Sequence, residues 1–358
     1  MKVLFTFIVP SGGMETLNRL RCEALREVAI KGHLLYSNAG SGLQNIKDIP
    51  TYISPTDDEL YKILRMFQYD AIITTSDFLM PQKLRKLNYN GPIIFEAQGL
   101  GTMISARRTL KDGASILEAN CQGALLPPTP HLVQLITDFC PALPKYIFPN
   151  LLDTVKFRYR PQTVPSKPVI AWVGRLEKNK NWKLFLKIAQ SLVNIKNELS
   201  FWVFHDDKLC SKEMLDLFWE KVHSYGLHDH IKVYANAPHS TMPDYLSRVG
   251  DSGGFLLSTS VLEGFGYAVA EAIACRCPVL STDSEGVRFF IRHNETGKFF
   301  ERNNMDNAVH QALELMDNLQ LRKQIRNRGA EYVSNLMSPQ QYAANFHNML
   351  LNLKAKQG

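Results

Sequence analysis

Short apolar runs alternate with longer amphipathic stretches along almost the whole chain. The short runs predict buried strands, and the stretches between them repeat their apolar positions at helical spacing. Strands that alternate with helices are typical of an α/β protein with parallel sheets. We predict strands at 3–9, 71–75, 93–97, 124–126, 146–148, 169–173, 201–204, 231–233, 255–257 and 279–281, and helices at 15–30, 183–195, 212–223, 267–274, 305–316 and from 339 onwards.

One proline-rich stretch divides this pattern into two halves. Residues 158–168 hold three prolines and no apolar periodicity, and a new strand follows them. A length of 358 residues also suits two domains. We therefore predict a first domain over 1–157, a linker over 158–168, a second domain over 169–337 and a final helix over 338–358. Because such sheets bind ligands at the carboxyl ends of their strands, the expected site is a cleft between the two domains.

The charge balance favours an anionic partner. The chain has 41 Lys and Arg against 34 Asp and Glu, a net charge of +7. An excess of this sign suits a phosphate-bearing substrate, an acidic membrane surface or nucleic acid. Nucleic acid is disfavoured because no long basic stripe with interleaved aromatic residues appears.

Cysteine usage and hydropathy indicate the compartment. None of the six cysteines forms a CxxC pair, which favours free thiols in a reducing environment. The first residues lack the long apolar core of a signal peptide, and no apolar run approaches a membrane span. We expect a cytoplasmic protein, and peripheral contact with the inner membrane surface stays open.

Two glycines follow the first predicted strand. Gly12 and Gly13 stand directly before a predicted helix, where bare backbone lets amides approach a ligand closely. The start of a helix also favours an anion. The pattern is not GxGxxG, and a tight turn without a ligand would need glycine as well, so both interpretations stay open.

Two cations follow the strand at 169–173. Arg175 and Lys180 stand between its carboxyl end and the next helix. Fixed cations beside a helix start can neutralise a diphosphate without a metal. The alternative is a solvated charged loop, because Glu177 and Lys178 lie between them.

The strongest candidate follows the strand at 255–257. Glu263 falls in the loop, and Glu271 lies within an apolar helix, with seven residues between them. A buried carboxylate is costly unless a ligand or a cation satisfies it, and carboxylates accept hydrogen bonds from sugar hydroxyls. The alternatives are a helix-start charge for Glu263 and a structural ion pair for Glu271.

Together these segments resemble the retaining glycosyltransferases of family four, which have the GT-B fold. Residues 173–189 resemble the family's Gly-Arg-x-x-x-x-Lys segment, and residues 258–286 resemble its paired glutamates with the following Ala and Pro-Val. Residues 294–299 fit the family's next strand. In the first half the match is thinner and consists of 12–15 and 148–153.

The resemblance implies a fold and an activity. The fold would be two Rossmann-like domains facing across a cleft, with the final helix crossing back to the first domain. The enzyme would move a hexose-type sugar from a nucleoside diphosphate sugar to an acceptor hydroxyl on a sugar, a lipid-linked carrier or a small molecule. The family retains the anomeric configuration and generally needs no metal, so we expect no cofactor besides the donor.

The resemblance also assigns roles by position. Arg175 and Lys180 would hold the diphosphate and stabilise it as leaving group. Glu263 would bind hydroxyls of the transferred sugar, and Glu271 would bind the nucleotide ribose. Around the diphosphate, the first domain would contribute Gly12 and Gly13, and the second would contribute the backbone of Gly264, Phe265, Gly266 and Tyr267.

Three residues of the first half are candidate contacts to the acceptor or the sugar. Gln98 stands where the family often has His; glutamine can hydrogen-bond a sugar hydroxyl but cannot accept a proton as imidazole does. His131 lies nearby in sequence, although a surface His at a helix start is the simpler interpretation. Arg107 belongs to a small basic cluster that suits an acidic acceptor, lipid head groups or a solvated helix face.

Other departures keep rival functions open. Residues 204–207 replace the family's Gly-x-Gly turn, and Leu151 replaces the Gly of its Asn-Gly-x-Asp pattern. A sugar-nucleotide epimerase can share this architecture and would need no acceptor. An inactive sugar-nucleotide-binding module would bind donor without releasing nucleoside diphosphate. A dehydrogenase is disfavoured because GxGxxG is missing.

Overall fold

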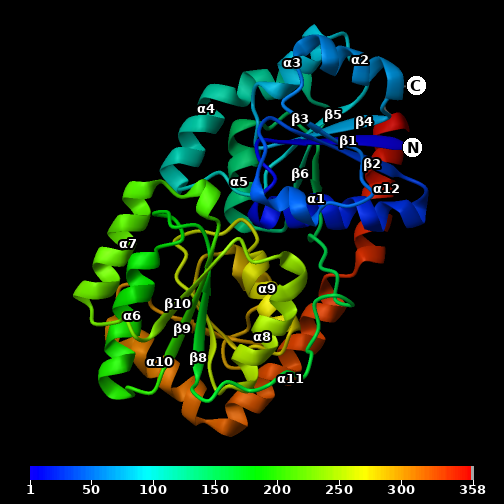
Figure 1. Cartoon of the computed structure of the whole chain (residues 1–358). Helices are drawn as coiled ribbons and strands as arrows, with labels where there is room; N and C mark the ends of the chain where they lie inside the picture. The colour runs from blue at the N-terminus through cyan, green and yellow to red at the C-terminus, as the bar shows by residue number, and fades with distance from the viewer. Residues whose placement is uncertain (356–358) are drawn as a thin grey trace. The chain divides into compact units, whose positions relative to one another are not determined.

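The computed structural model describes residues 1–355. The chain forms two compact units: unit 1 combines Met1–Asp153 with the segment that starts at Met337, and unit 2 is Thr154–Leu336. Each unit is a parallel sheet with helices packed against it (Figure 1). Both sheets agree with the predicted α/β class.

Unit 2 begins before the predicted linker because the first linker residues pack on it. The Tyr159 hydroxyl donates to Asp251 Oδ2 at 3.0 Å, and the Arg160 N–H donates to Ser247 Oγ at 3.0 Å. The start of 158–168 is therefore held by the second unit.

The sheet of unit 1 has seven parallel strands in the order β3-β2-β1-β4-β5-β6-β7. The interior strand β1 pairs Val3 with Gly32 on one side and with Ala71 on the other. It is buried on both faces, as a strand of a covered parallel sheet must be. The strands are β1 Lys2–Phe7, β2 Lys31–Tyr36, β3 Thr51–Ile53, β4 Ala71–Thr75, β5 Ile93–Glu96, β6 Gly123–Leu126 and β7 Lys145–Ile147.

The helices of unit 1 follow their local sequence signals. Thr56 and Glu59 form a capping box at the start of α2, in which each satisfies a backbone N–H of the other. The predicted helix over 15–30 was misplaced: it begins at Gly12 and ends at Leu25, before Ala29 adopts a left-handed conformation. The helices are α1 Gly12–Leu25, α2 Asp57–Phe67, α3 Met80–Lys86, α4 Met103–Asn120, α5 Pro130–Phe139 and α12 Pro339–Ala355.

The last helix, α12, packs on unit 1. The Phe346 ring lies 5.7 Å from the Phe5 ring of β1, and Tyr342 lies 5.4 Å from Phe148. In Figure 1 this helix (red) lies against α1 (blue). The apolar stripe that begins near Pro339 is therefore buried against the first sheet and its helix.

The sheet of unit 2 has six parallel strands in the order β10-β9-β8-β11-β12-β13. The order reverses between β8 and β11, which makes their carboxyl ends a switch point where such sheets bind ligands. The strands are β8 Val169–Val173, β9 Ser200–His205, β10 Ile231–Ala235, β11 Phe255–Ser258, β12 Val279–Thr282 and β13 Lys298–Phe300. The helices are α6 Trp182–Ile195, α7 Lys212–Ser224, α8 Met242–Asp251, α9 Tyr267–Ala274, α10 Met305–Asp317 and α11 Leu319–Leu336.

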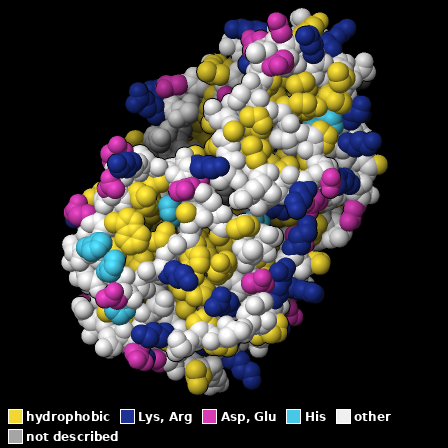
Figure 2. Space-filling view, viewed as in Figure 1, with side chains coloured by type: hydrophobic (Ala, Val, Ile, Leu, Met, Phe, Trp, Pro, Cys, Tyr) yellow, Lys and Arg dark blue, Asp and Glu magenta, His cyan; other side chains and the backbone are white. Residues whose placement is uncertain are grey.

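The surface carries a mixture of charges. Lys and Arg side chains are scattered over the face shown in Figure 2 together with Asp and Glu. Within residues 1–355, no helix is long and apolar enough to cross a membrane.

Candidate functional site

Two loops meet at the switch point of unit 2. One follows β8 and leads into α6, and the other follows β11 and leads into α9. The Val261 N–H donates to the Asn179 carbonyl at 2.8 Å, and the Asn179 side-chain amide donates to the Leu262 carbonyl at 2.9 Å. These bonds join segments about 80 residues apart in sequence.

The same junction brings two predicted site residues together. The Lys180 ammonium donates to Glu263 Oε1 at 2.5 Å, and the Ser260 hydroxyl donates to the same oxygen at 2.6 Å. The two charged side chains are 22% and 13% exposed. Charge-assisted bonds of this length in a partly buried site are strong, so the carboxylate has a fixed position.

Two hydrogen bonds connect the backbone of Lys180 to the hydrophobic core. Its carbonyl accepts a hydrogen bond from the Thr259 hydroxyl at 2.9 Å. That hydroxyl in turn accepts from the Trp172 indole N–H at 3.1 Å. Trp172 is buried in β8, so the position of Lys180 depends on the hydrophobic core of unit 2.

A strained turn holds the backbone of Glu263. The Glu263 N–H donates to the Ser284 carbonyl, and the Gly286 N–H donates to the carbonyls of Ser284 (2.8 Å) and Glu263 (3.2 Å). The 284–286 bond closes a γ-turn with Glu285 at φ 62° and ψ −64°, a rare conformation for a residue other than glycine. A Cβ on Gly286 would lie 2.5 Å from the Glu263 carbonyl oxygen, so the close approach requires glycine.

Glu271 is the fifth residue of α9 and is 6% exposed. Its carboxylate accepts a hydrogen bond from His239 Nε2 at 2.8 Å, and the His239 ring lies 4.6 Å from the Phe157 ring. His239 is not predicted from the sequence, because no local pattern links a residue in the turn before α8 to a carboxylate 32 positions later. This hydrogen bond agrees with a structural role for Glu271. It also leaves other lone pairs of the carboxylate for a ligand.

The segment between the two glutamates contributes backbone and buried rings. Gly266 has φ +93° and caps the start of α9. Phe265 and Tyr267 are buried, and the Phe265 ring packs against Tyr267 (5.1 Å) and Phe290 (5.6 Å). Their rings therefore belong to the core, and a ligand at the amino end of α9 would meet the main chain.

Arg175 lies at the carboxyl end of β8, but its environment differs from that of Lys180. Its side chain is 50% exposed and pairs with Glu177 at 3.1 Å. Among the described residues, Arg175 forms its ion pair with Glu177, whereas Glu263 forms its ion pair with Lys180. The solvated-loop interpretation fits Arg175 in this state.

In unit 1, Gln98 follows β5 and pairs with Asn150. Its Nε2 donates to Glu96 Oε1 (3.0 Å) and to Asn150 Oδ1 (3.1 Å), and its Oε1 accepts from Asn150 Nδ2 (2.6 Å). An amide has two N–H donors and two acceptor lone pairs. Both Gln98 donors are used, so it can accept one further hydrogen bond from a hydroxyl but cannot donate one.

A buried ion pair supports Gln98. Arg21 and Glu96 are both 0% exposed, and the guanidinium contacts both carboxylate oxygens at 2.8 and 2.9 Å. The Thr75 hydroxyl donates to Glu96 Oε2 at 2.6 Å. Burial by itself would lower the pKa of Arg21, but the Glu96 carboxylate reverses this effect and raises the pKa above its ordinary value.

The remaining predicted residues lie in separate places of unit 1. Gly12 has φ +57° and is the first residue of α1, followed by Gly13. His131 is 6% exposed in the first turn of α5, so its interpretation as a surface residue is wrong: the start of α5 packs into the unit. Arg107 is exposed on α4.

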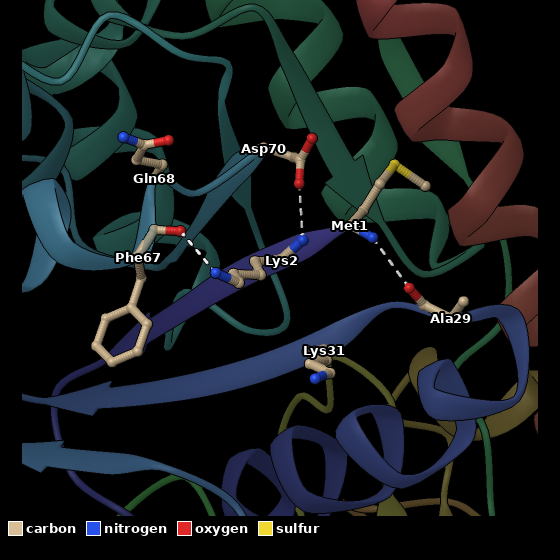
Figure 3. Close-up of a pocket in the computed structure, with 7 residues that line it drawn as sticks. All are labelled: Met1, Lys2, Ala29, Lys31, Phe67, Gln68 and Asp70. Atoms are coloured by element: carbon tan, nitrogen blue, oxygen red, sulfur yellow. Dashed lines mark hydrogen bonds between the residues drawn. The ribbon is translucent and has the colours of Figure 1, made fainter.

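A pocket of about 330 Å³ in unit 1 is a poorer candidate. It lies at the amino ends of β1 and β2, the opposite edge from the carboxyl ends (Figure 3). Its polar groups contact one another: Lys2 Nζ donates to the Phe67 carbonyl, and the Lys2 N–H donates to Asp70. None of the site residues predicted from the sequence lines this pocket.

The chain has recognisable relatives. Residues 155–332 match the family described as glycosyl transferases group 1. The chain is 21% identical over 185 residues to the poly(ribitol-phosphate) alpha-N-acetylglucosaminyltransferase of Staphylococcus aureus, a match that covers 51% of this chain and 35% of that protein. It is 29% identical over 160 residues to an N-acetylgalactosaminyltransferase of Campylobacter jejuni that acts on a diphospho-undecaprenol-linked sugar, covering 44% and 39%. The matched segments thus span less than half the length of these relatives.

Solved structures share the whole fold. Sucrose-phosphate synthase from Thermosynechococcus elongatus superposes with a TM-score of 0.83 at 16% identity, covering 99% of this chain and all of that one. The Anabaena protein HepE, solved in complex with UDP and glucose, superposes with a TM-score of 0.83 at 12% identity, covering 98% and 100%. At this level of identity the likeness establishes the fold.

Proposed function

Because the chain belongs to the glycosyl transferases group 1 family and has the GT-B fold, we propose that it moves a hexose-type sugar from a nucleoside diphosphate sugar to an acceptor hydroxyl. In this proposal the transfer retains the anomeric configuration and needs no metal. The observation that carries it is the contact of Lys180 with Glu263 at the switch point of unit 2. A cation and a carboxylate side by side can serve a leaving diphosphate and the hydroxyls of a sugar.

Lys180 supplies positive charge to the departing diphosphate. Its ammonium has three N–H donors, and Glu263 is its hydrogen-bond partner within the described residues. The remaining donors can bind phosphate oxygens while the Glu263 contact keeps the side chain oriented. Preorganised charge of this kind stabilises a transition state without reorganising when the bond breaks.

Glu263 and Glu271 hold the two ends of the donor. Glu263 accepts hydrogen bonds from the transferred sugar, because Lys180 and Ser260 both contact Oε1 and leave Oε2 for hydroxyls. Glu271 accepts from the ribose while His239 keeps it in place. These fixed contacts select an orientation of the donor before transfer.

The relatives suggest which sugar nucleotides should be tested first as donors. The names of the Staphylococcus and Campylobacter enzymes specify N-acetylglucosamine and N-acetylgalactosamine, and HepE was solved with UDP and glucose. We propose a UDP-linked sugar as donor, with the two UDP-N-acetylhexosamines and UDP-glucose tested first. GDP-linked and ADP-linked sugars complete the panel.

A matching donor should stabilise the protein against heat without added metal. A ligand at 100 times its dissociation constant adds about 2.7 kcal/mol, or about 5–10 °C in melting temperature for a unit of this size. Thermal denaturation with each donor measures the shift, and the free sugar without its nucleotide is the control. The absence of a shift with every donor would contradict the proposal.

Product analysis separates the transferase from its rivals. Conversion of the donor to another sugar nucleotide without an acceptor would identify an epimerase. Binding without release of nucleoside diphosphate would identify an inactive binding module. With an acceptor present, the proton NMR coupling of the new glycosidic bond reports whether the configuration was retained.

Removal of divalent metals should leave turnover unchanged. Lys180 and Arg175 follow β8, and their N–H groups that do not contact Glu263 and Glu177 can donate to a diphosphate in place of a metal. Nucleoside diphosphate release is measured before and after dialysis against EDTA, with a metal-dependent transferase treated in parallel. Loss of activity that Mg²⁺ or Mn²⁺ restores would show that the metal-free proposal is wrong.

A further inference from the structure

Unit 2 has a second hollow, beside the loop that carries Glu263. A cavity of about 770 Å³ opens at the carboxyl ends of β12 and β13. Val261 and Leu262 form one side of it, and Asn307 and Gln311 of α10 form another. Its volume is that of a typical small-molecule site. None of the residues assigned above to the donor lines it.

The charges of this cavity do not favour a phosphate ligand. Its lining includes two guanidinium groups, Arg288 and Arg302, against three carboxylates, Asp283, Glu285 and Glu301. Arg288 already donates to both oxygens of Asp283, at 2.6 and 2.7 Å. Without an excess of positive charge, the cavity does not attract an anion.

Two neutral hydrogen-bond donors are fixed in the lining. His293 Nδ1 accepts the Phe299 N–H at 3.0 Å, which leaves the hydrogen on Nε2. Partial burial and the Lys298 ammonium lower the pKa of His293, so the ring is neutral at neutral pH. Asn307 Oδ1 accepts the Glu301 N–H at 2.9 Å, which leaves its NH₂ group to donate.

The lining also holds an unused acceptor and an aromatic ring. Gln311 Oε1 is buried and has no hydrogen-bond partner among the described residues, a costly state unless a ligand or water donates to it. Phe299 contributes a half-buried ring. Neutral donors, a neutral acceptor and an aromatic surface together suit an uncharged sugar, whose hydroxyls donate and accept and whose C–H face packs on a ring.

We propose that this cavity binds a sugar unit of an uncharged oligosaccharide. Val261 and Leu262 immediately precede Glu263, and the backbone of Glu285 is bridged to that of Glu263. A sugar bound here would lie against the loop that orients the transferred sugar. The inference rests on the proposed function, because the bound chain would be an extended acceptor or the product of the transfer.

The test measures oligosaccharide binding and donor binding separately. Maltotetraose, cellotetraose and chitotetraose are titrated into the full-length protein by saturation-transfer NMR and calorimetry. Phe299→Leu keeps an apolar side chain without the ring, and Gln311→Met keeps the length without the amide. We expect each to weaken binding of the oligosaccharide about three- to tenfold. Gln341→Met, an exposed glutamine of α12, is the matched control and should bind like the unmodified protein.

Donor-induced thermal stabilisation should be unchanged in all three variants, which shows that unit 2 is folded. If the donor stabilises the protein but no uncharged tetrasaccharide binds, the inference is overturned and the proposed function stands. Binding that both cavity variants retain also overturns it, because the sugar would then lie elsewhere. Binding of sulfated tetrasaccharides alone overturns the uncharged class. Failure of every donor to stabilise the protein would instead contradict the proposed function.

Discussion

Lys180→Met should lower turnover about 100- to 1000-fold, the range seen when one preorganised electrostatic contact to a transition state is removed. The substitution removes the ammonium that neutralises the leaving diphosphate. It also leaves the Glu263 carboxylate, 13% exposed, without its cation. The charge of that carboxylate would then oppose the diphosphate, so both consequences act in the same direction.

The measurement is nucleoside diphosphate release at saturating donor, with kcat and KM determined separately. A contact that strengthens in the transition state should appear mainly in kcat. Lys178→Met is the matched control, because Lys178 is an exposed lysine of the same loop and its removal should leave both constants unchanged. Arg175→Ala should cost less, about 10- to 100-fold, from the loss of charge-assisted bonds to the donor. Unchanged kcat in Lys180→Met would refute the assigned role.

The strands could be predicted from the sequence where apolar runs are long and uninterrupted. All five strands expected in the second domain are present, and the sixth, β13, follows from the family resemblance more than from its three-residue run. The strands β2 and β3 were missed. His33 interrupts the apolar run of β2, and β3 is only half-buried, so neither has a strong pattern of its own. Both are stabilised by pairing with neighbours, which is a long-range effect.

The sequence predicts candidate site residues but not the contacts between them. Lys180 and Glu263 were each expected, and the structure joins them because the β8 and β11 loops leave adjacent strands. Their supporting residues were not foreseen. Ser260 lies in the same loop as Glu263, whereas His239 and the γ-turn at Glu285 lie in other loops. No spacing rule connects them to the glutamates.

Arg21→Met should destabilise unit 1 by about 3–5 kcal/mol, because it leaves the fully buried Glu96 carboxylate without its cation. The loss is a large part of the stability of an ordinary domain. The variant also removes the contact of the guanidinium with the Phe5 ring, 3.9 Å from its centroid. Lys354→Met is the control in the same unit: it breaks the more exposed ion pair with Asp70 and should cost less than about 1 kcal/mol.

Two optical signals can assign the loss to one unit. All four tryptophans, at 172, 182, 202 and 219, belong to unit 2, whereas both units contribute to far-UV circular dichroism. In Arg21→Met, the circular dichroism transition in urea should move to lower concentration while the tryptophan transition stays in place.

The double variant Arg21→Met with Glu96→Gln tests the cause of this loss. It removes both charges, and the glutamine carbonyl can still accept from Thr75 or Gln98, which contact Glu96 in the unmodified protein. If the cost comes from an unpaired buried charge, the double variant should recover most of the stability lost by Arg21→Met, since neutral replacements of buried ion pairs are often tolerated. A double variant as unstable as the single one would assign the loss to packing of the arginine side chain. The ion pair would then be a by-product of filling the space between α1 and β5.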